Sequence, residues 1–295
     1  MRVVKELRVY KEGTPQYFFY KEQHENQTLD FVNTKQNIKL GREILTMDKA
    51  LSMLDKFVDP SDPDVSCPNS FHAYQTAERI RKQFPEDYPL QICGLIHDIG
   101  KILFSFGEPN WAVVGDTFAV GCAFPESIVY FDTMKGNPDY GKFDSFGIYK
   151  PVCGIEQLKL SFGHDEYLYK VLQENQQVHK LTKKYQNIIR FRSFYPWHTG
   201  GDYQQFEKES DANIKEDVLL QPKTGNNLGI EILDEKIIKF NSGHIKDILE
   251  TIKGKSIDIK SFPLCIFIIV LTNSPALILH NTSNSKLYDR INDTL

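Results

Sequence analysis

Three residues near the middle of the chain, His97, Asp98 and Lys101, are of the right types and spacing to do chemistry together. They lie within residues 91–103, whose apolar side chains recur at the spacing of a buried amphipathic helix. Charged groups are seldom buried unless they are paired or bind a metal. A neighbouring histidine and aspartate offer an imidazole nitrogen and a carboxylate oxygen, and Lys101 projects towards the same region. The spacing predicts a pair of metal ligands with a fixed cation beside it.

Two further predicted helices carry candidate partners for this pair. Residues 71–84 begin with His72, and residues 158–173 contain His164. A single histidine on a helix is more often a structural hydrogen-bond partner than a ligand, and a lone His-Asp pair is more often a surface feature. Together, however, imidazole and carboxylate ligands from separate helices suit iron, manganese, zinc or nickel. This order in a helical chain resembles the HD superfamily, most of whose members are metal-dependent phosphohydrolases. We expect an all-α fold, an HD-domain-like helical bundle with a divergent C-terminal segment of uncertain structure.

Composition narrows the class of protein. The chain has 295 residues, 41% of them hydrophobic and 25% charged, which are ordinary globular values. A net charge of −4 gives no support for a nucleic-acid or anionic-membrane partner. The five cysteines lack a C-x-x-C pair, which favours a reducing compartment, and no apolar run is long enough for a membrane span. We therefore expect a cytoplasmic monomer that binds neither nucleic acid nor membrane.

Longer runs of sequence are similar to one branch of the superfamily, the inositol oxygenase family. The resemblance covers roughly residues 8–207, and its matching runs are residues 27–32, 61–65, 72–78, 94–101, 111–118, 161–167 and 193–200. It implies a helical domain that holds two non-haem iron ions. It also implies that dioxygen, as co-substrate, cleaves the ring of myo-inositol to give D-glucuronate, a step of inositol catabolism.

The resemblance implies roles for individual residues. The expected iron ligands are His72, His97, Asp98 and His164, with Asp98 bridging the two ions. Lys101 would contact inositol and stabilise developing negative charge, so Lys101 and Asp98 are the expected catalytic residues. The other expected substrate-binding residues are Arg8, Asp59, Pro60, Ser61, Gly115, Asp116 and Ser193.

The chain departs from the family pattern at two points. The family has a histidine ligand where this chain has Arg192, directly before Ser-Phe-Tyr-Pro. A guanidinium has no lone pair to offer, and its charge about 5 Å from a divalent iron would cost on the order of 6 kcal/mol at an effective dielectric near 20. Either Arg192 points away or the second iron site is damaged. The family's last ligand is an aspartate, and nothing after Leu219 matches the sequence around it. Asp211, Asp217 and Asp234 are available carboxylates, and no motif favours one of them.

These departures determine where we expect the domain boundary and which alternative functions we consider. We expect residues 1–215 to form the catalytic domain and residues 216–295 a divergent extension without a recognised motif. Two other functions stay open. One is an HD-type metal-dependent phosphohydrolase, and the other is a non-catalytic family member with a damaged second iron site.

Overall fold

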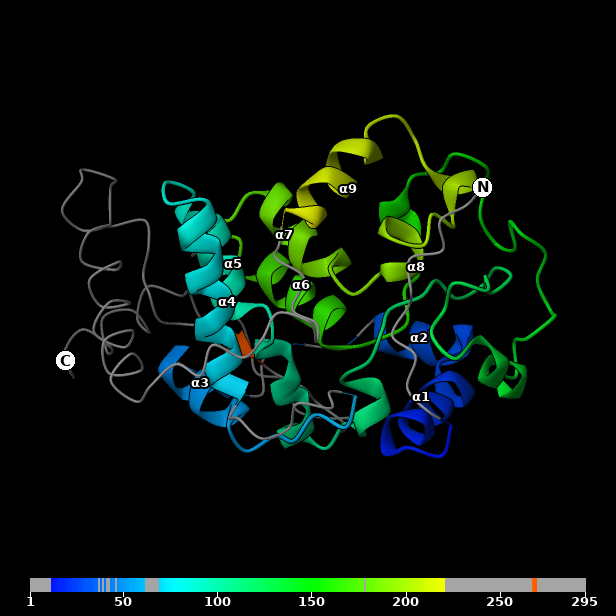
Figure 1. Ribbon diagram of the computed structural model, residues 1–295, viewed down its shortest axis with the longest axis horizontal. Coiled ribbons are helices and arrows are strands. Elements are labelled where there is room, and N and C mark those ends of the chain that lie inside the picture. Colours follow the sequence, from blue (N-terminus) through cyan, green and yellow to red (C-terminus); the bar gives the residue numbers. More distant parts are fainter. Residues whose placement is uncertain are drawn as a thin grey trace, which may run out of the picture.

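A computed structural model describes residues 12–36, 38, 40, 43–45, 47–61, 69–177, 179–220 and 267–269 of the chain. Arg8, expected to bind substrate, and Asp234 lie outside these residues. In the described part the regular secondary structure is almost entirely helical, with long loops between some of the helices (Figure 1). The α-helices are α1 Pro15–Asn26, α2 Leu29–Gln36, α3 Met47–Leu54, α4 Asn69–Gln83, α5 Tyr88–Ile96, α6 His164–Glu174, α7 Lys183–Phe191, α8 Tyr195–His198 and α9 Asp211–Leu219. This confirms the predicted all-α class.

Shorter elements join these helices. The 3₁₀ helices are η1 Ile99–Phe106, η2 Asn110–Ala112, η3 Phe131–Gly136, η4 Ile155–Gln157 and η5 Gln204–Phe206. A two-stranded antiparallel ladder pairs β1 Glu43–Leu45 with β2 Phe267–Ile269, which the all-α prediction did not include. Helix α9 continues past residue 215 and packs against α7 and α8. The predicted domain boundary at that residue stays a prediction.

The largest hydrophobic core is formed by the elements that carry or flank the residues expected to do chemistry. It takes fully buried side chains from α3, α5, η1, α6 and α7, among them Leu54, Ile96, Ile99, Leu168 and Ile189. Each of these helices turns one apolar stripe inward, as the helical spacing of apolar residues requires. The elements that carry the candidate ligands are therefore fixed to one another through a shared core.

Helices α4 and α5 pack side by side (Figure 1). Gly94 of α5 makes this possible, because a Cβ there would lie 2.6 Å from the side chain of Ile80 and 3.2 Å from the backbone of Ala77. The close approach brings the first turn of α4, with His72, next to the end of α5, with His97.

The single helix predicted over residues 91–103 is wrong, because two elements meet there. Helix α5 ends at Ile96, and the 3₁₀ helix η1 starts at Ile99, with Asp98 at φ −95° and ψ −1° between them. Apolar spacing could not reveal the break, since both segments bury the same face. A change to 3₁₀ geometry within a helical run often marks a functional segment. Here it places His97 and Asp98 at a turn.

A second glycine brings η1 against α6. A Cβ on Gly100 would lie 2.1 Å from the carbonyl oxygen of His164, so no larger residue fits without moving the backbone. Helix α6 begins at His164, later than the residue 158 expected from the sequence, because Leu160 forms an isolated bridge with Ala119. As a result Asp98 and His164 face each other across the contact.

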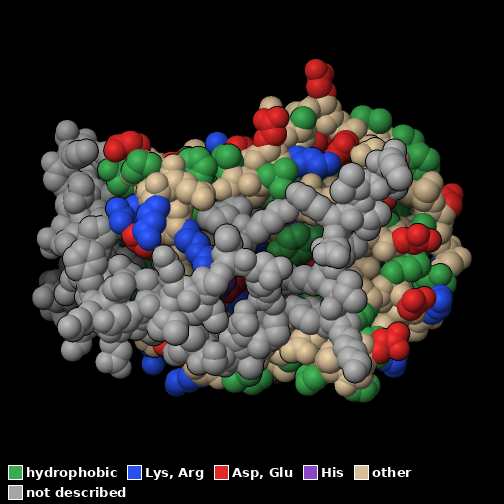
Figure 2. Space-filling model, viewed as in Figure 1, with side chains coloured by type: hydrophobic (Ala, Val, Ile, Leu, Met, Phe, Trp, Pro, Cys, Tyr) green, Lys and Arg blue, Asp and Glu red, His purple; other side chains and the backbone are tan. Residues whose placement is uncertain are grey.

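The described surface carries mixed charge. Figure 2 shows lysine and arginine interspersed with aspartate and glutamate over the described part of the visible face, without a large area of one sign. None of the helices found in the described ranges is both long and apolar enough to cross a bilayer.

Candidate functional site

The turn between α5 and η1 holds the ligand pair that the sequence predicted. Both His97 and Asp98 are 1% exposed. The Nδ1–H of His97 donates to the carbonyl of Gly94 at 2.7 Å, which leaves Nε2 as the nitrogen with a lone pair. That Nε2 lies 3.3 Å from Oδ1 of Asp98 and has no hydrogen-bond partner among the described residues. Histidines that bind metals through Nε2 usually donate Nδ1–H to a carbonyl or carboxylate, and His97 has this arrangement.

His72 completes a group of three on the same side. Its Nε2 lies 3.9 Å from Oδ2 of Asp98, and its ring meets that of His97 edge to face, with the ring centroids 5.2 Å apart. Desolvation lowers the pKa of His72, so that its ring is neutral at ordinary pH. One ligand atom from each of His72, His97 and Asp98 lies within 4.8 Å of the other two. These residues could hold one metal ion.

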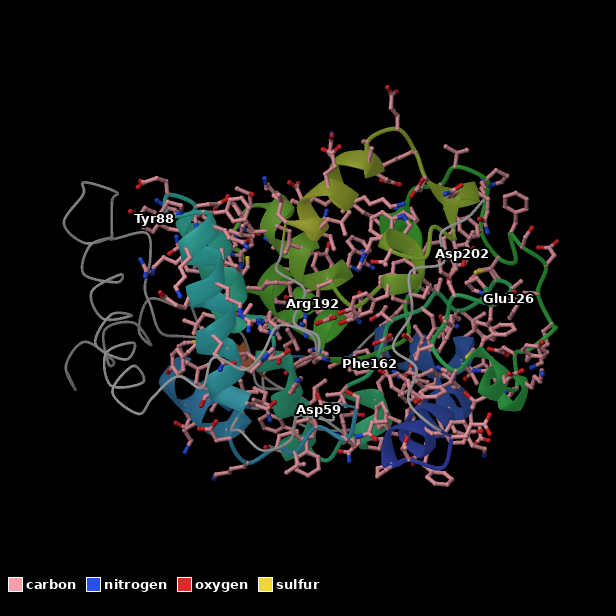
Figure 3. All side chains as sticks on the ribbon, viewed as in Figure 1. Asp59, Tyr88, Glu126, Phe162, Arg192 and Asp202 are labelled. Atoms are coloured by element: carbon pink, nitrogen blue, oxygen red, sulfur yellow. The ribbon has the colours of Figure 1, made fainter. Side chains whose placement is uncertain are left out.

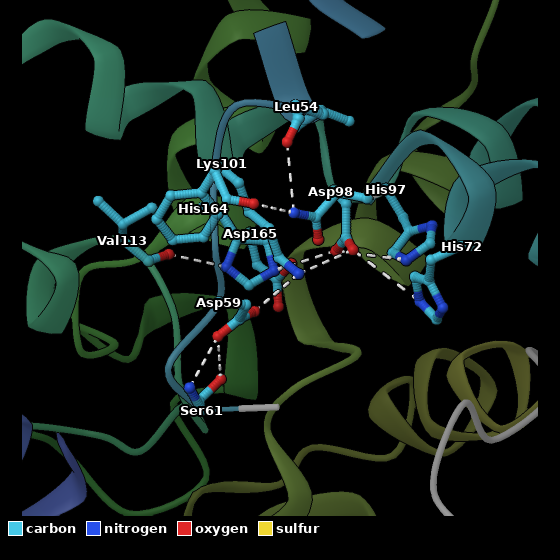
Figure 4. A network of polar contacts seen from close by, with 12 residues as sticks. Leu54, Asp59, Ser61, His72, His97, Asp98, Lys101, Val113, His164 and Asp165 are labelled. Atoms are coloured by element: carbon cyan, nitrogen blue, oxygen red, sulfur yellow. Dashed lines mark hydrogen bonds and ion pairs between the residues drawn. The ribbon is translucent and has the colours of Figure 1, made fainter. Parts of the chain in front are cut away.

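Lys101 lies beside this group, between two carboxylates. Its Nζ is 2.9 Å from Oδ2 of Asp98 and 2.8 Å from Oδ2 of Asp59 (Figure 4). Asp59 in turn accepts hydrogen bonds from the backbone N–H and the hydroxyl of Ser61, at 2.9 and 2.6 Å. Burial opposes the charge of Lys101, but the two carboxylates outweigh it and raise the pKa of the ammonium above its usual value.

His164 faces Asp98 from the first residue of α6. Its Nδ1–H donates to the carbonyl of Val113 at 2.8 Å, which again leaves Nε2 with the lone pair. This Nε2 is 3.5 Å from Oδ1 of Asp98 and 3.1 Å from Oδ1 of Asp165. The same oxygen of Asp98 therefore stands between two imidazoles, those of His97 and His164.

Arg192 points into this centre and not away from it. It lies directly after α7, and Figure 3 shows it near the middle of the helices. Its Nη2 donates to Oδ1 of Asp98 at 2.5 Å and to Nε2 of His164, and its Nε donates to Oδ1 of Asp165 at 2.8 Å. Burial opposes the charge, but Asp165 and Asp98 outweigh it and raise the pKa of the guanidinium.

Four more of the residues expected to bind substrate, Pro60, Gly115, Asp116 and Ser193, lie on segments that are adjacent in sequence or hydrogen-bonded to residues of this centre. Pro60 stands between Asp59 and Ser61 in one turn. The carbonyl of Ser193 accepts from the backbone N–H of Thr117 at 2.9 Å, which ties the segment after Arg192 to the segment that follows Gly115 and Asp116. The hydroxyl of Tyr20, on α1, donates to Oδ1 of Asp116 at 3.1 Å.

Sequence reasoning left Asp165 without a role, although it is 3% exposed and holds Arg192. The available signal was the dipeptide His164-Asp165, which repeats the His-Asp pair of residues 97 and 98. Both ring nitrogens of His198 are engaged elsewhere: Nε2 donates to the carbonyl of Arg192 at 3.0 Å, and Nδ1 contacts the hydroxyl of Thr199 at 2.9 Å. Asp211 accepts from the backbone of Ile155 and Lys208, and Asp217 pairs with Lys184 at 2.9 Å.

Comparison with known proteins identifies the relatives of this chain. A family model described as myo-inositol oxygenase matches residues 16–224. The inositol oxygenase of Danio rerio is 48% identical over 202 residues, which cover 66% of this chain and 72% of the relative. That of Homo sapiens is 48% identical over 198 residues, covering 65% and 69% of the two chains. A probable inositol oxygenase of Oryza sativa subsp. japonica is 44% identical over 206 residues, covering 67% and 66%.

Proposed function

Because the chain belongs to the myo-inositol oxygenase family, we propose that it is a metal-dependent oxygenase that cleaves the ring of myo-inositol with dioxygen to give D-glucuronate. The observation that carries this proposal beyond the similarity is the side chain of Lys101. It places a charged ammonium next to a buried group of metal-ligand atoms. A polyol bound there would meet a cation and a metal site together.

One iron fits the residues present. The Nε2 of His97 is a buried polar atom without a hydrogen-bond partner in the described part of the chain, and an unpaired atom of this kind costs about 1–3 kcal/mol unless something binds it. Iron held by His72, His97 and Asp98 would satisfy it. A second iron between Asp98 and His164 does not fit, because Arg192 already donates to both. When bound, iron supplies the redox chemistry that dioxygen requires.

The chain's own residues would bind the substrate and control its charge. An ammonium has three N–H donors, and carboxylates take two of those on Lys101, which leaves one for a substrate hydroxyl. Asp59 can accept from a neighbouring hydroxyl, while Ser61 holds the carboxylate in place. The compact positive charge of Lys101 would stabilise negative charge that develops on a substrate oxygen hydrogen-bonded to it.

We propose that Pro60, Gly115, Asp116 and Ser193 line the polyol site with Asp59, Ser61 and Lys101. The HD-type domain, the cytoplasmic location and the monomeric state stay predictions.

An oxygen-electrode assay tests the function. The full chain, loaded with Fe(II) without oxygen, is mixed with myo-inositol in aerated buffer, and oxygen uptake and D-glucuronate are measured together. We expect uptake that depends on myo-inositol and matches the product mole for mole. Phosphate release from a phosphomonoester without oxygen uptake would point to the phosphohydrolase alternative instead.

The position of Arg192 favours a second candidate, a family member that binds a polyol without turnover. A guanidinium in the centre leaves Lys101 and Asp59 free to bind hydroxyls while it limits the metal content. Calorimetric binding of myo-inositol in the absence of any inositol-dependent oxygen uptake would establish this candidate and contradict the first.

A further inference from the structure

We infer that the side chain of Arg192 takes the place of a second metal ion, so that the chain holds one ion, at His72, His97 and Asp98. The inference rests on the proposed function, because it concerns the metal that the oxygenase would use. It assigns Arg192 a positioning role, since the side chain acts through the ligands it contacts.

The donor atoms on both sides of Asp98 are spaced as metal ligands are. Oδ1 of Asp98 is 3.3 Å from Nε2 of His97 and 3.5 Å from Nε2 of His164. Two atoms that each lie about 2.1 Å from one ion stand about 3.0–3.5 Å apart. Asp98 could therefore face an ion on either side, with His97 or with His164.

On the His164 side a protein atom already fills the space between the donors. Nη2 of Arg192 lies 2.5 Å from Oδ1 of Asp98 and donates also to Nε2 of His164. The lone pair of His164 that a metal would need is thus taken by an N–H. On the other side the Nε2 of His97 has no partner within the described residues. A donor atom is therefore available to a metal on the His97 side and is taken on the His164 side.

The guanidinium is held firmly in this position. The Nε of Arg192 donates to Asp165 at 2.8 Å. The ring of His198 donates to the backbone carbonyl of Arg192 at 3.0 Å. The side chain of Arg192 is 15% exposed and that of Asp165 is 3% exposed. Moving the arginine aside would leave the carboxylate of Asp165 buried without its cation, which is strongly unfavourable.

The charges at the centre lead to the same conclusion. Three buried carboxylates, those of Asp59, Asp98 and Asp165, face the cations Lys101 and Arg192, which leaves a net charge of about −1 for these side chains. One divalent ion changes this net charge to about +1, and a second would change it to about +3 in a buried site. The centre is balanced for one ion.

Counting bound metal tests the inference directly. The full chain and its Arg192→His variant are dialysed without oxygen against Fe(II), and in parallel against Mn(II), and bound metal is measured per chain. We expect one ion in the wild-type chain and two in Arg192→His, because histidine removes the charge and adds a donor. Arg192→Ala should bind the second ion at least tenfold more weakly than Arg192→His.

Arg190→Lys is the matched control. Arg190 is also buried, but it pairs with Glu166 at 2.7 Å, away from Asp98, so its replacement should leave one ion per chain. Two ions in the wild-type chain would overturn the inference, and so would a single ion in a folded Arg192→His variant. If circular dichroism shows that both Arg192 variants fail to fold, the wild-type count decides by itself. The count needs neither inositol nor oxygen, so its failure is distinct from failure of the proposed function.

Discussion

We propose that substrate binding depends most on the ammonium of Lys101, which joins Asp59 to Asp98 through contacts of 2.8 and 2.9 Å. We predict that Lys101→Met lowers kcat/KM for myo-inositol by about 100- to 1,000-fold, as expected when a charge-stabilising donor is removed. Inositol-dependent oxygen uptake at several substrate concentrations measures the change.

Lys35→Met serves as the control for Lys101→Met. This variant removes an ion pair of similar length outside the site, in which Nζ of Lys35 lies 2.6 Å from Oε1 of Glu108. The control should lower the thermal midpoint but leave kcat/KM within about twofold. Equal losses of kcat/KM in the two variants would show that Lys101 matters only for folding.

His24 is a buried residue whose titration affects stability rather than chemistry. Its Nδ1 contacts the hydroxyl of Thr133 at 2.6 Å, and that hydroxyl donates to the carbonyl of Tyr130, so Nδ1 carries the hydrogen. Burial lowers the pKa of His24 to about 3. As the pH falls, the ring of His24 binds a second proton near pH 6.5 in the unfolded chain, but not in the folded chain. Stability should therefore fall as the pH decreases from 6.5 towards 3, by up to about 1.4 kcal/mol per pH unit.

We predict that His24→Asn, which keeps a donor towards Thr133, makes this dependence shallower. Urea unfolding of both proteins between pH 7 and pH 4.5 measures the two slopes. The same slope in wild type and variant would mean that His24 does not carry the effect.

At the scale of elements, the contact between η1 and α6 decides whether Asp98 and His164 meet. We predict that Gly100→Ala lowers the free energy of unfolding by about 2–3 kcal/mol or more and weakens metal binding, because the added Cβ would lie 2.1 Å from a backbone oxygen. Chemical denaturation and metal titration check the two effects.

Gly163→Ala is the nearby comparison for Gly100→Ala. A Cβ on Gly163 would lie 3.5 Å from the carbonyl of Val113, an ordinary contact, and its φ of −158° suits any residue. Its effect should stay within about 0.5 kcal/mol. If Gly100→Ala proved as mild as this control, the close approach would not be what positions Asp98.

Helical periodicity predicted the elements that carry the ligands, but not the way they end. Apolar spacing placed helices around His72, His97 and His164, and the structure has α4, α5 and α6 there. Spacing cannot separate an α-helix from a 3₁₀ continuation that buries the same face, which is why the break at Asp98 was missed. The late start of α6 depends on the pairing of Leu160 with Ala119, a contact between distant residues.

At the scale of the whole molecule, the direction of one side chain was beyond sequence reasoning. The residue types predicted a conflict at Arg192, and only the fold shows that Asp165 draws the guanidinium inward. Asp165 itself was visible as part of a second His-Asp pair, but its partner stands 27 residues later in the chain. Long-range pairing of this kind has no local signature.

Metal binding should stabilise the folded chain as a whole, since the proposed ligands come from α4 and from the turn between α5 and η1. We predict that Fe(II) at 100 times its dissociation constant adds about 2.7 kcal/mol to the free energy of unfolding, which corresponds to a rise in the thermal midpoint of about 5 °C or more. His97→Ala should abolish this rise. His179→Ala should keep it, because His179 contacts the carbonyl of Leu172 instead. Anaerobic calorimetry of the three proteins decides, and a rise that persists in His97→Ala would place the metal elsewhere.

An anomalous difference map at the iron edge, from crystals of the full chain grown with Fe(II) and myo-inositol, tests the central claim most directly. We predict one peak, bounded by His72, His97 and Asp98, with an inositol hydroxyl within hydrogen-bond distance of Nζ of Lys101 and with Arg192 still between Asp98 and His164. Two peaks, or a single peak between Asp98 and His164, would contradict it.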